Sequence, residues 1–246
     1  MFIWSKTDKI ALPIAIAVVF LLAIIFRLTL KNKRNSIKTL PLKTLAVMGV
    51  GLEIAKQIYF IFIADVYIKY ALPFHFCTLI LITLPLAQFL PNKISKHLKA
   101  PAVIFSLLVF LLVLIHPSSM IGSATANLLK FTNFHTFTFH FVVVAYGVFS
   151  IFLEDYAPSL KHFWTLIGYV AFYASYGVPM AFTFNSNYIK ILSAKEIPFL
   201  EQFRLNCGQL AYDVLLFTGI TVIAILVLTV YYLIYNLIKG GKNNAT

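Results

Sequence analysis

Charged side chains are scarce in this sequence, and their scarcity excludes an ordinary water-soluble domain. Only 11% of the 246 residues are charged, whereas 61% are hydrophobic. A soluble domain of average composition has about 25% charged and about 45–50% apolar residues. One water-facing globule cannot bury so much apolar surface, so lipid must be the solvent for much of the chain. The composition therefore predicts an all-α integral membrane protein.

Acidic residues and cysteines are also few. Eight Asp and Glu stand against 20 Lys and Arg, which gives a net charge of +12. In a soluble protein this excess would favour nucleic-acid binding. Here the basic residues lie mainly between apolar segments, where they orient helices and contact anionic lipid headgroups. We therefore predict membrane lipids as partners and no nucleic acid. Two cysteines, Cys77 and Cys207, are too few for a disulfide framework.

Motifs for nucleotides and metals are missing. The sequence has no P-loop, no Gly-rich dinucleotide fingerprint and no His-Glu-x-x-His. His135 and His140 are five residues apart, whereas helical metal ligands prefer spacings of three or four. We predict no cofactor and no metal.

Seven apolar segments divide the chain, most of them near the roughly 20 residues that cross a hydrocarbon core. The third and fourth are the shortest, so six spans are the alternative count. We find no internal repeat and predict one multi-pass membrane domain over residues 1–246. The seven segments cover residues 10–30, 44–67, 72–90, 100–115, 132–153, 162–184 and 210–238.

Lys and Arg between these segments predict the orientation. With seven spans, twelve of them fall on the side that holds residues 27–43, 93–99, 161 and 239–242, and seven fall on the other side. Cytoplasmic loops carry the excess of positive charge. The N-terminus is therefore predicted outside a cell membrane and the C-terminus in the cytoplasm.

Ionisable residues inside a span are costly and usually face the interior of the helix bundle. Glu53 and Lys56 are three residues apart in the second segment, so they can pair along one helix face. Such a pair either fixes helix packing or forms a headgroup or proton site, and the sequence leaves both interpretations open.

Cys77 lies near the start of the third segment. Pro73 suits the first turn of a helix, which puts Cys77 about one turn inside it. The helix dipole there favours a thiolate, whereas apolar burial opposes it. A single membrane cysteine is more often an inert small hydrophobe, so its position alone favours no catalytic role.

Further polar residues flank the later segments. Asn187 and Tyr188 follow the sixth segment and Asp213 opens the seventh. Capping and interfacial anchoring would explain each one individually. With seven spans, however, they share the outer half of the membrane with Cys77 and His140. This convergence predicts a site at the boundary of the outer leaflet.

The ordered motifs resemble a known family. Residues 72–77 read Leu-Pro-Phe-His-Phe-Cys, which resembles a motif of the YwaF-like bacterial integral membrane proteins. The acid-then-Lys pair, the His that opens the fifth span's apolar run and the Asn-Tyr element are similar to further motifs there. The resemblance runs in order from about residue 50 to 235. The family is in turn similar to the eukaryotic transmembrane protein 164 acyltransferases.

The resemblance implies acyl transfer or ester hydrolysis on membrane lipids. Cys77 would be the nucleophile that forms a thioester, and His140 would be its base. Two alternatives stay open: a small-solute or ion transporter or its membrane subunit, and an assembly partner without chemistry of its own. The residues expected to support the site or bind substrate are His75, Glu53, Lys56, Asn187, Tyr188, Asp213 and His135.

Overall fold

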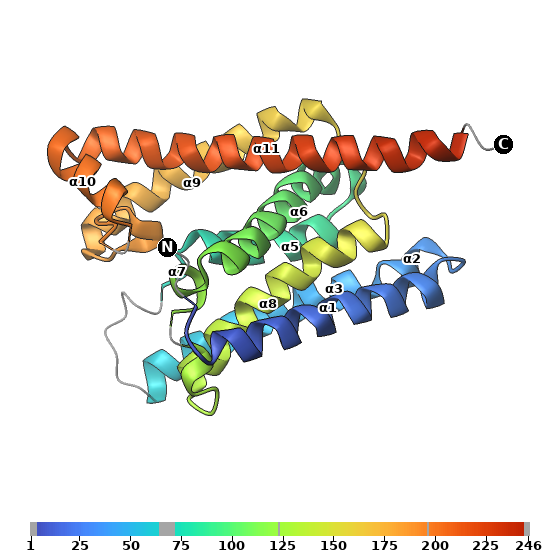
Figure 1. Ribbon diagram of the computed structural model, residues 1–246, viewed down its shortest axis with the longest axis horizontal. Coiled ribbons are helices and arrows are strands. Elements are labelled where there is room, and N and C mark those ends of the chain that lie inside the picture. Colours follow the sequence, from blue (N-terminus) through green and yellow to red (C-terminus); the bar gives the residue numbers. More distant parts are fainter. Residues whose placement is uncertain (1–3, 64–71, 123, 196, 244–246) are drawn as a thin grey trace. The chain divides into compact units, whose positions relative to one another are not determined.

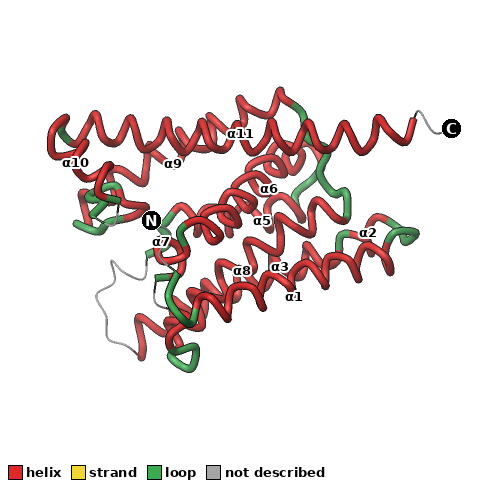
Figure 2. Tube along the Cα trace, viewed as in Figure 1, coloured by secondary structure: helices red, strands yellow, loops and turns green. Residues whose placement is uncertain are grey.

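The computed structural model describes residues 4–63, 72–122, 124–195 and 197–243, and these described residues form helices and loops without a strand (Figure 1, Figure 2). This confirms the all-α membrane fold. The chain divides into two compact units. Unit 1 comprises Met1–Tyr59 and Ile80–Ala157, and unit 2 comprises Phe60–Leu79 and Pro158–Thr246. The assignment of all 246 residues to one domain stays a prediction.

Six helical stretches within the described residues are long and apolar enough to cross a membrane. The predicted third segment, residues 72–90, forms helix α5 (Phe76–Phe89) of 14 residues, shorter than the roughly 20 that span a hydrocarbon core. By length, the alternative count of six therefore agrees with the structure. The six stretches are α1 (Asp8–Leu30), α3 (Leu40–Ile58) with η1 (Tyr59–Ile63), α6 (Asn92–Ile115), α8 (Phe131–Phe152), η3 (Leu160–His162) with α9 (Phe163–Phe184), and α11 (Gln209–Asn243).

Short helices occupy several of the connections. A π-helix, η1, ends the second stretch, and π-helical turns are rare and frequently occur at functional sites. The others are α2 (Asn35–Lys38), α7 (Pro117–Ile121), η2 (Ala124–Ala126), η4 (Tyr188–Lys190) and α10 (Pro198–Cys207).

Helix α8 forms the core of unit 1. Its residues 139–150 are all buried, because α8 packs against α1, α3 and α6 (Figure 1). Gly147 allows α6 to come close, since a Cβ at this position would lie 2.9 Å from the Cβ of Ser106. Small residues at such contacts are typical of helices that pack within membranes.

Ion pairs hold one end of unit 1 together. Arg27, near the end of α1, forms an ion pair of 2.8 Å with Glu154, which follows α8. Lys99, near the start of α6, forms one of 2.8 Å with Asp155. The end of α1, the start of α6 and the end of α8 therefore lie together.

In unit 2, α9 and α11 pack against each other. Asn185 ends α9 in the left-handed conformation, with a φ of 45°; asparagine tolerates this conformation better than most residues. The chain then runs through η4 and α10 before α11 begins, so much of this long connection is helical.

Candidate functional site

Cys77 is the second residue of α5 and is half-buried. The prediction from Pro73 was wrong, because α5 begins at Phe76, three residues after Pro73, so Cys77 lies at the helix start and not one turn inside it. Helix α9 holds the segment before it. The buried Tyr173 hydroxyl of α9 donates a hydrogen bond of 2.9 Å to the backbone oxygen of Phe74. The Phe76 ring meets the Tyr173 ring edge-on, with centroids 5.0 Å apart. Tyr173 therefore fixes the backbone that leads into Cys77.

Two of the predicted supporting residues meet beside this segment. The ring of His75 lies edge-on to that of Tyr188, with centroids 5.2 Å apart. Tyr188 is fully buried and also lies edge-on to Phe74, at 5.7 Å. Aromatic rings from α9 and η4 thus surround the motif that ends in Cys77. Tyr173 was not expected from the sequence, because one more tyrosine in an aromatic-rich apolar helix gives no signal.

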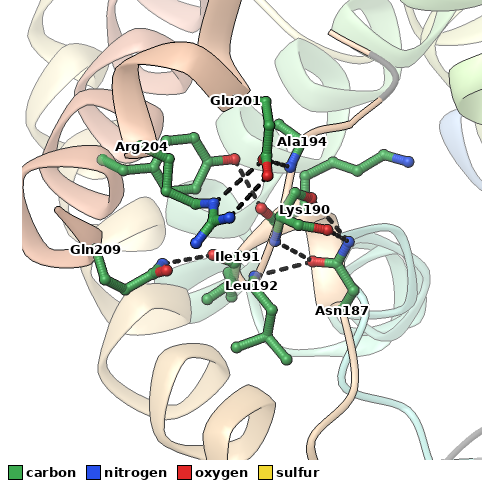
Figure 3. Close-up of polar contacts among 10 residues, drawn as sticks. Asn187, Lys190, Ile191, Leu192, Ala194, Glu201, Arg204 and Gln209 are labelled. Carbon is green, nitrogen blue, oxygen red and sulfur yellow. Dashed lines mark hydrogen bonds and ion pairs between the residues drawn. The ribbon is translucent and has the colours of Figure 1, made fainter. Parts of the chain in front are cut away.

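Asn187 organises the turn that follows α9 (Figure 3). Its Oδ1 accepts hydrogen bonds from the backbone N–H groups of Leu192, at 2.9 Å, and Ser193, at 3.2 Å. Ile189 and Lys190 within the turn have positive φ values of 46° and 67°. Such values are rare for residues other than glycine and store backbone strain where the surrounding structure enforces them. Asn187 therefore has a clear structural role in holding this turn.

The carboxylate of Glu201 links α10 to the same turn by a hydrogen bond. Glu201 Oε2 accepts a hydrogen bond of 2.8 Å from the backbone N–H of Ala194, and Arg204 Nη2 lies 2.7 Å from Glu201 Oε1. The hydrogen bonds from Arg204, together with that from Ala194, hold the pKa of Glu201 at about 2, so the carboxylate stays ionised at neutral pH.

Asp213 joins the connection to α11. Gln209 Nε2 donates to Asp213 Oδ1 at 2.9 Å. It also donates to the backbone oxygen of Ile191 at 2.6 Å (Figure 3). The Tyr212 hydroxyl donates to the backbone oxygen of Lys190 at 2.7 Å. Asp213 is thus buried with a partner from its own helix, and within unit 2 it belongs to the same polar assembly as the turn held by Asn187.

His140 is buried in α8 of unit 1. Its Nδ1 lies 2.8 Å from the backbone oxygen of Thr136. A carbonyl oxygen only accepts, so Nδ1 must carry the hydrogen. In the neutral ring Nε2 is then the basic nitrogen. This is the tautomer in which Nε2 can accept a proton.

A second group of predicted residues meets between α3 and α8. Glu53 Oε1 lies 2.7 Å from Lys56 Nζ and accepts a hydrogen bond of 2.7 Å from Gln57, which confirms the pairing predicted from the spacing. His135 of α8 lies beside the backbone of Leu52 and close enough to Glu53 and Lys56 of α3 to interact with their charges. Glu53 Oε2 and His135 Nε2 are buried with no hydrogen-bond partner among the described residues. This buried polar cluster lies within unit 1.

Cys77 belongs to unit 2 and His140 to unit 1, and their pairing as nucleophile and base stays a prediction. Over the described ranges, no group of three or more His, Cys, Asp or Glu side chains is arranged to hold a metal ion.

Comparison with known proteins adds one result. The family model described as TMEM164 family matches residues 3–238, nearly the whole chain. No curated protein and no solved structure matches this chain. The relationship to transmembrane protein 164 expected from the motifs is thereby confirmed, whereas the narrower YwaF-like assignment stays a prediction.

Proposed function

This chain belongs to the TMEM164 family, and on that premise we propose that it is an enzyme of the cell membrane that transfers or hydrolyses the acyl groups of lipid esters. Its helices make it a multi-pass membrane protein. In the proposal Cys77 is the nucleophile and His140 is the base. Membrane lipids supply the acyl group.

The fixed tautomer of His140 carries the proposal. Because Nδ1 donates to the Thr136 backbone oxygen, Nε2 is the nitrogen able to take a proton. A base oriented by a third group in this way is the usual partner of a cysteine nucleophile. Cys77 supplies a thiol in the first turn of α5. It directly follows the segment whose backbone is hydrogen-bonded to Tyr173 at Phe74.

The proposed reaction has two steps. First, the Cys77 thiol gives its proton to His140 Nε2 while its sulfur attacks the ester carbonyl carbon. The C–O ester bond breaks, and the leaving alcohol takes the proton from Nε2. Second, water or an acceptor alcohol gives a proton to Nε2 and its oxygen attacks the thioester. The C–S bond breaks and the thiol recovers the proton.

Covalent trapping tests the nucleophile. A lipid-like electrophile should label the purified protein in nanodiscs, and Cys77→Ser should abolish the labelling. His140→Gln should slow it by about 100- to 10,000-fold, the range typical of a lost general base. Cys207→Ser is the matched control, because Cys207 is exposed at the end of α10, and this variant should label like the wild type. Labelling that survives Cys77→Ser would contradict the proposal.

Cross-linking tests the pairing separately from activity. In a Cys207→Ser background, His140→Cys should form a disulfide with Cys77 under mild oxidation, since such bonds need Cα atoms about 4.4–6.8 Å apart. Val144→Cys, one helical turn further along α8 and also buried, is the control and should react less. Failure of His140→Cys to cross-link, together with unchanged lipid acyl profiles in Cys77→Ser cells, would argue against this pairing.

A second candidate function is transport of a small solute or ion, which the unpartnered buried atoms of Glu53 and His135 favour. Ionisable groups within membrane spans often mark ion or proton pathways. Flux into proteoliposomes should then depend on Glu53 and His135 and survive Cys77→Ser. Flux that is equal with and without the protein would remove this candidate.

A further inference from the structure

Basic side chains converge at the end of unit 1 where α1 and α8 end and α6 begins. The ion pairs of Arg27 with Glu154 and of Lys99 with Asp155 bring these elements together. Lys43 at the start of α3 lies over the ring of Phe89, the last residue of α5, 6.0 Å from its centroid. The α1–α3 connection and the start of α6 therefore emerge at one place, which we name the basic end.

The acidic residues of the basic end are already paired. The described residues 27–43 and 86–99 contain no Asp or Glu, and the only two acids that follow α8 before Ala157 are Glu154 and Asp155. Glu154 pairs with Arg27, and Asp155 accepts hydrogen bonds from Lys99 and Gln88. These acids leave most of the positive charge of the basic end uncompensated.

Six cations lie on this end in addition to the paired Arg27 and Lys99 and to Lys43. Five of the six are exposed and Lys38 is half-buried. They come from two places in the chain, the α1–α3 connection and the first two turns of α6. The six are Lys31, Lys33, Arg34, Lys38, Lys93 and Lys96.

Large apolar side chains lie between these cations. Ile37 in α2, Leu40 at the start of α3 and Ile94 in the first turn of α6 are 44%, 57% and 51% exposed. A segment that mixes exposed apolar and basic side chains is suited to the membrane interface, where the apolar groups enter the acyl boundary and the cations remain at the headgroups. Because α1, α3 and α6 are spans that begin or end here, this end lies at headgroup depth.

We propose that the basic end binds the anionic headgroups of phospholipids in the leaflet that it faces. The complementarity is between clustered ammonium and guanidinium groups and lipid phosphates, and anionic surfaces attract juxtamembrane basic clusters of this size. The proposal concerns a surface that contains neither Cys77 nor His140, so it goes beyond the proposed acyl chemistry and does not depend on it.

Native mass spectrometry of the full-length protein tests the proposal. The purified protein is equilibrated with equal amounts of phosphatidylglycerol and phosphatidylcholine, both ether-linked so that no ester chemistry can consume them. Bound phosphatidylglycerol should exceed phosphatidylcholine severalfold for the wild type. The variant with Lys31, Lys33, Arg34 and Lys38 all replaced by Gln should bind the two lipids near parity.

The matched control replaces four exposed cations elsewhere by Gln, namely Lys6, Lys9, Lys130 and Lys195, and should keep the preference. Wild-type protein alone gives a second readout, because the preference should fall as salt screens exposed charges. Equal loss in both quadruple variants would show a general charge effect and overturn the proposal. So would a wild-type preference that is absent or insensitive to salt.

Discussion

Glu53 and Lys56 form a largely buried ion pair in which each charge is stabilised by the other. Their side chains are 14% and 12% exposed, and Lys56 Nζ lies 2.7 Å from Glu53 Oε1. We expect Lys56→Met to lower the free energy of unfolding by about 3–5 kcal/mol, because it leaves the Glu53 carboxylate buried without its counterion. Adding Glu53→Gln should recover most of the loss, since no buried charge then remains. Unfolding of the purified protein in mixed micelles measures both variants.

An exposed pair in the same unit provides the comparison. Arg27 and Glu154 are 36% and 37% exposed, and exposed ion pairs contribute only about 0–1 kcal/mol. Glu154→Gln should therefore change the unfolding free energy by less than about 1 kcal/mol. If Lys56→Met costs no more than Glu154→Gln, the Glu53 carboxylate is not held as a buried charge.

Sequence spacing predicts contacts within one helix better than contacts between helices. The three-residue interval identified the pair of Glu53 and Lys56, because neighbours on one helix face are fixed by helix geometry. The hydrogen bond from Tyr173 to the Phe74 backbone joins positions 99 residues apart. No local pattern encodes such a partner. The link of Gln209 to the Ile191 backbone was missed for the same reason.

Packing of α6 against α8 depends on Gly147. A Cβ at this position would lie 2.9 Å from the Ser106 Cβ and 3.2 Å from the backbone nitrogen of Leu107. Because part of this contact is backbone, it cannot be relieved by turning a side chain. We expect Gly147→Ala to destabilise the protein by about 1–3 kcal/mol through overpacking, measured as the thermal midpoint in detergent.

Gly168 in α9 is the matched control for this substitution. A Cβ there meets nothing within 4 Å. Alanine also stabilises a helix interior by about 0.5–1 kcal/mol relative to glycine. Gly168→Ala should therefore raise the thermal midpoint or leave it unchanged. A similar destabilisation by both substitutions would mean that the α6–α8 contact is not the cause.

Helix ends were harder to predict than helix positions. Apolar runs located all six long helices, because each run of this kind forms a helix in lipid. The predicted fourth segment began at residue 100, whereas α6 begins at Asn92 after Pro91. Residues 92–99, which are mostly polar, form the first turns of this helix, and an argument from hydropathy does not detect them. The same argument read residues 72–75 as part of the third span, although α5 begins only at Phe76.

The direction of each helix in unit 1 bears on the topology of the whole molecule. Thr7, before α1, is hydrogen-bonded at 2.8 Å to Thr125, which lies between α6 and α8. The opposite ends of α1 and α8 meet through Arg27 and Glu154. The chain therefore crosses unit 1 in alternating directions through α1, α3, α5, α6 and α8. Helix α5 returns to the basic end although its 14 residues rise only about 21 Å.

The five helices α1, α3, α5, α6 and α8 together with α9 and α11 predict seven passes, of which α5 is the shortest. Seven passes place the two termini on opposite sides of the membrane. Since cytoplasmic loops carry the excess of Lys and Arg, we expect the basic end and the C-terminus in the cytoplasm.

In a Cys207→Ser background, a membrane-impermeant maleimide should label Asn127→Cys in intact cells. It should label Lys33→Cys only after permeabilisation, and a C-terminal tag should be protected likewise. Both engineered positions are exposed, so an unlabelled site reports its side of the membrane. Labelling that places Lys33→Cys and Asn127→Cys on the same side of the membrane would instead mean six passes, with α5 dipping into the membrane without crossing it, because only α3 and α6 would then separate these two positions.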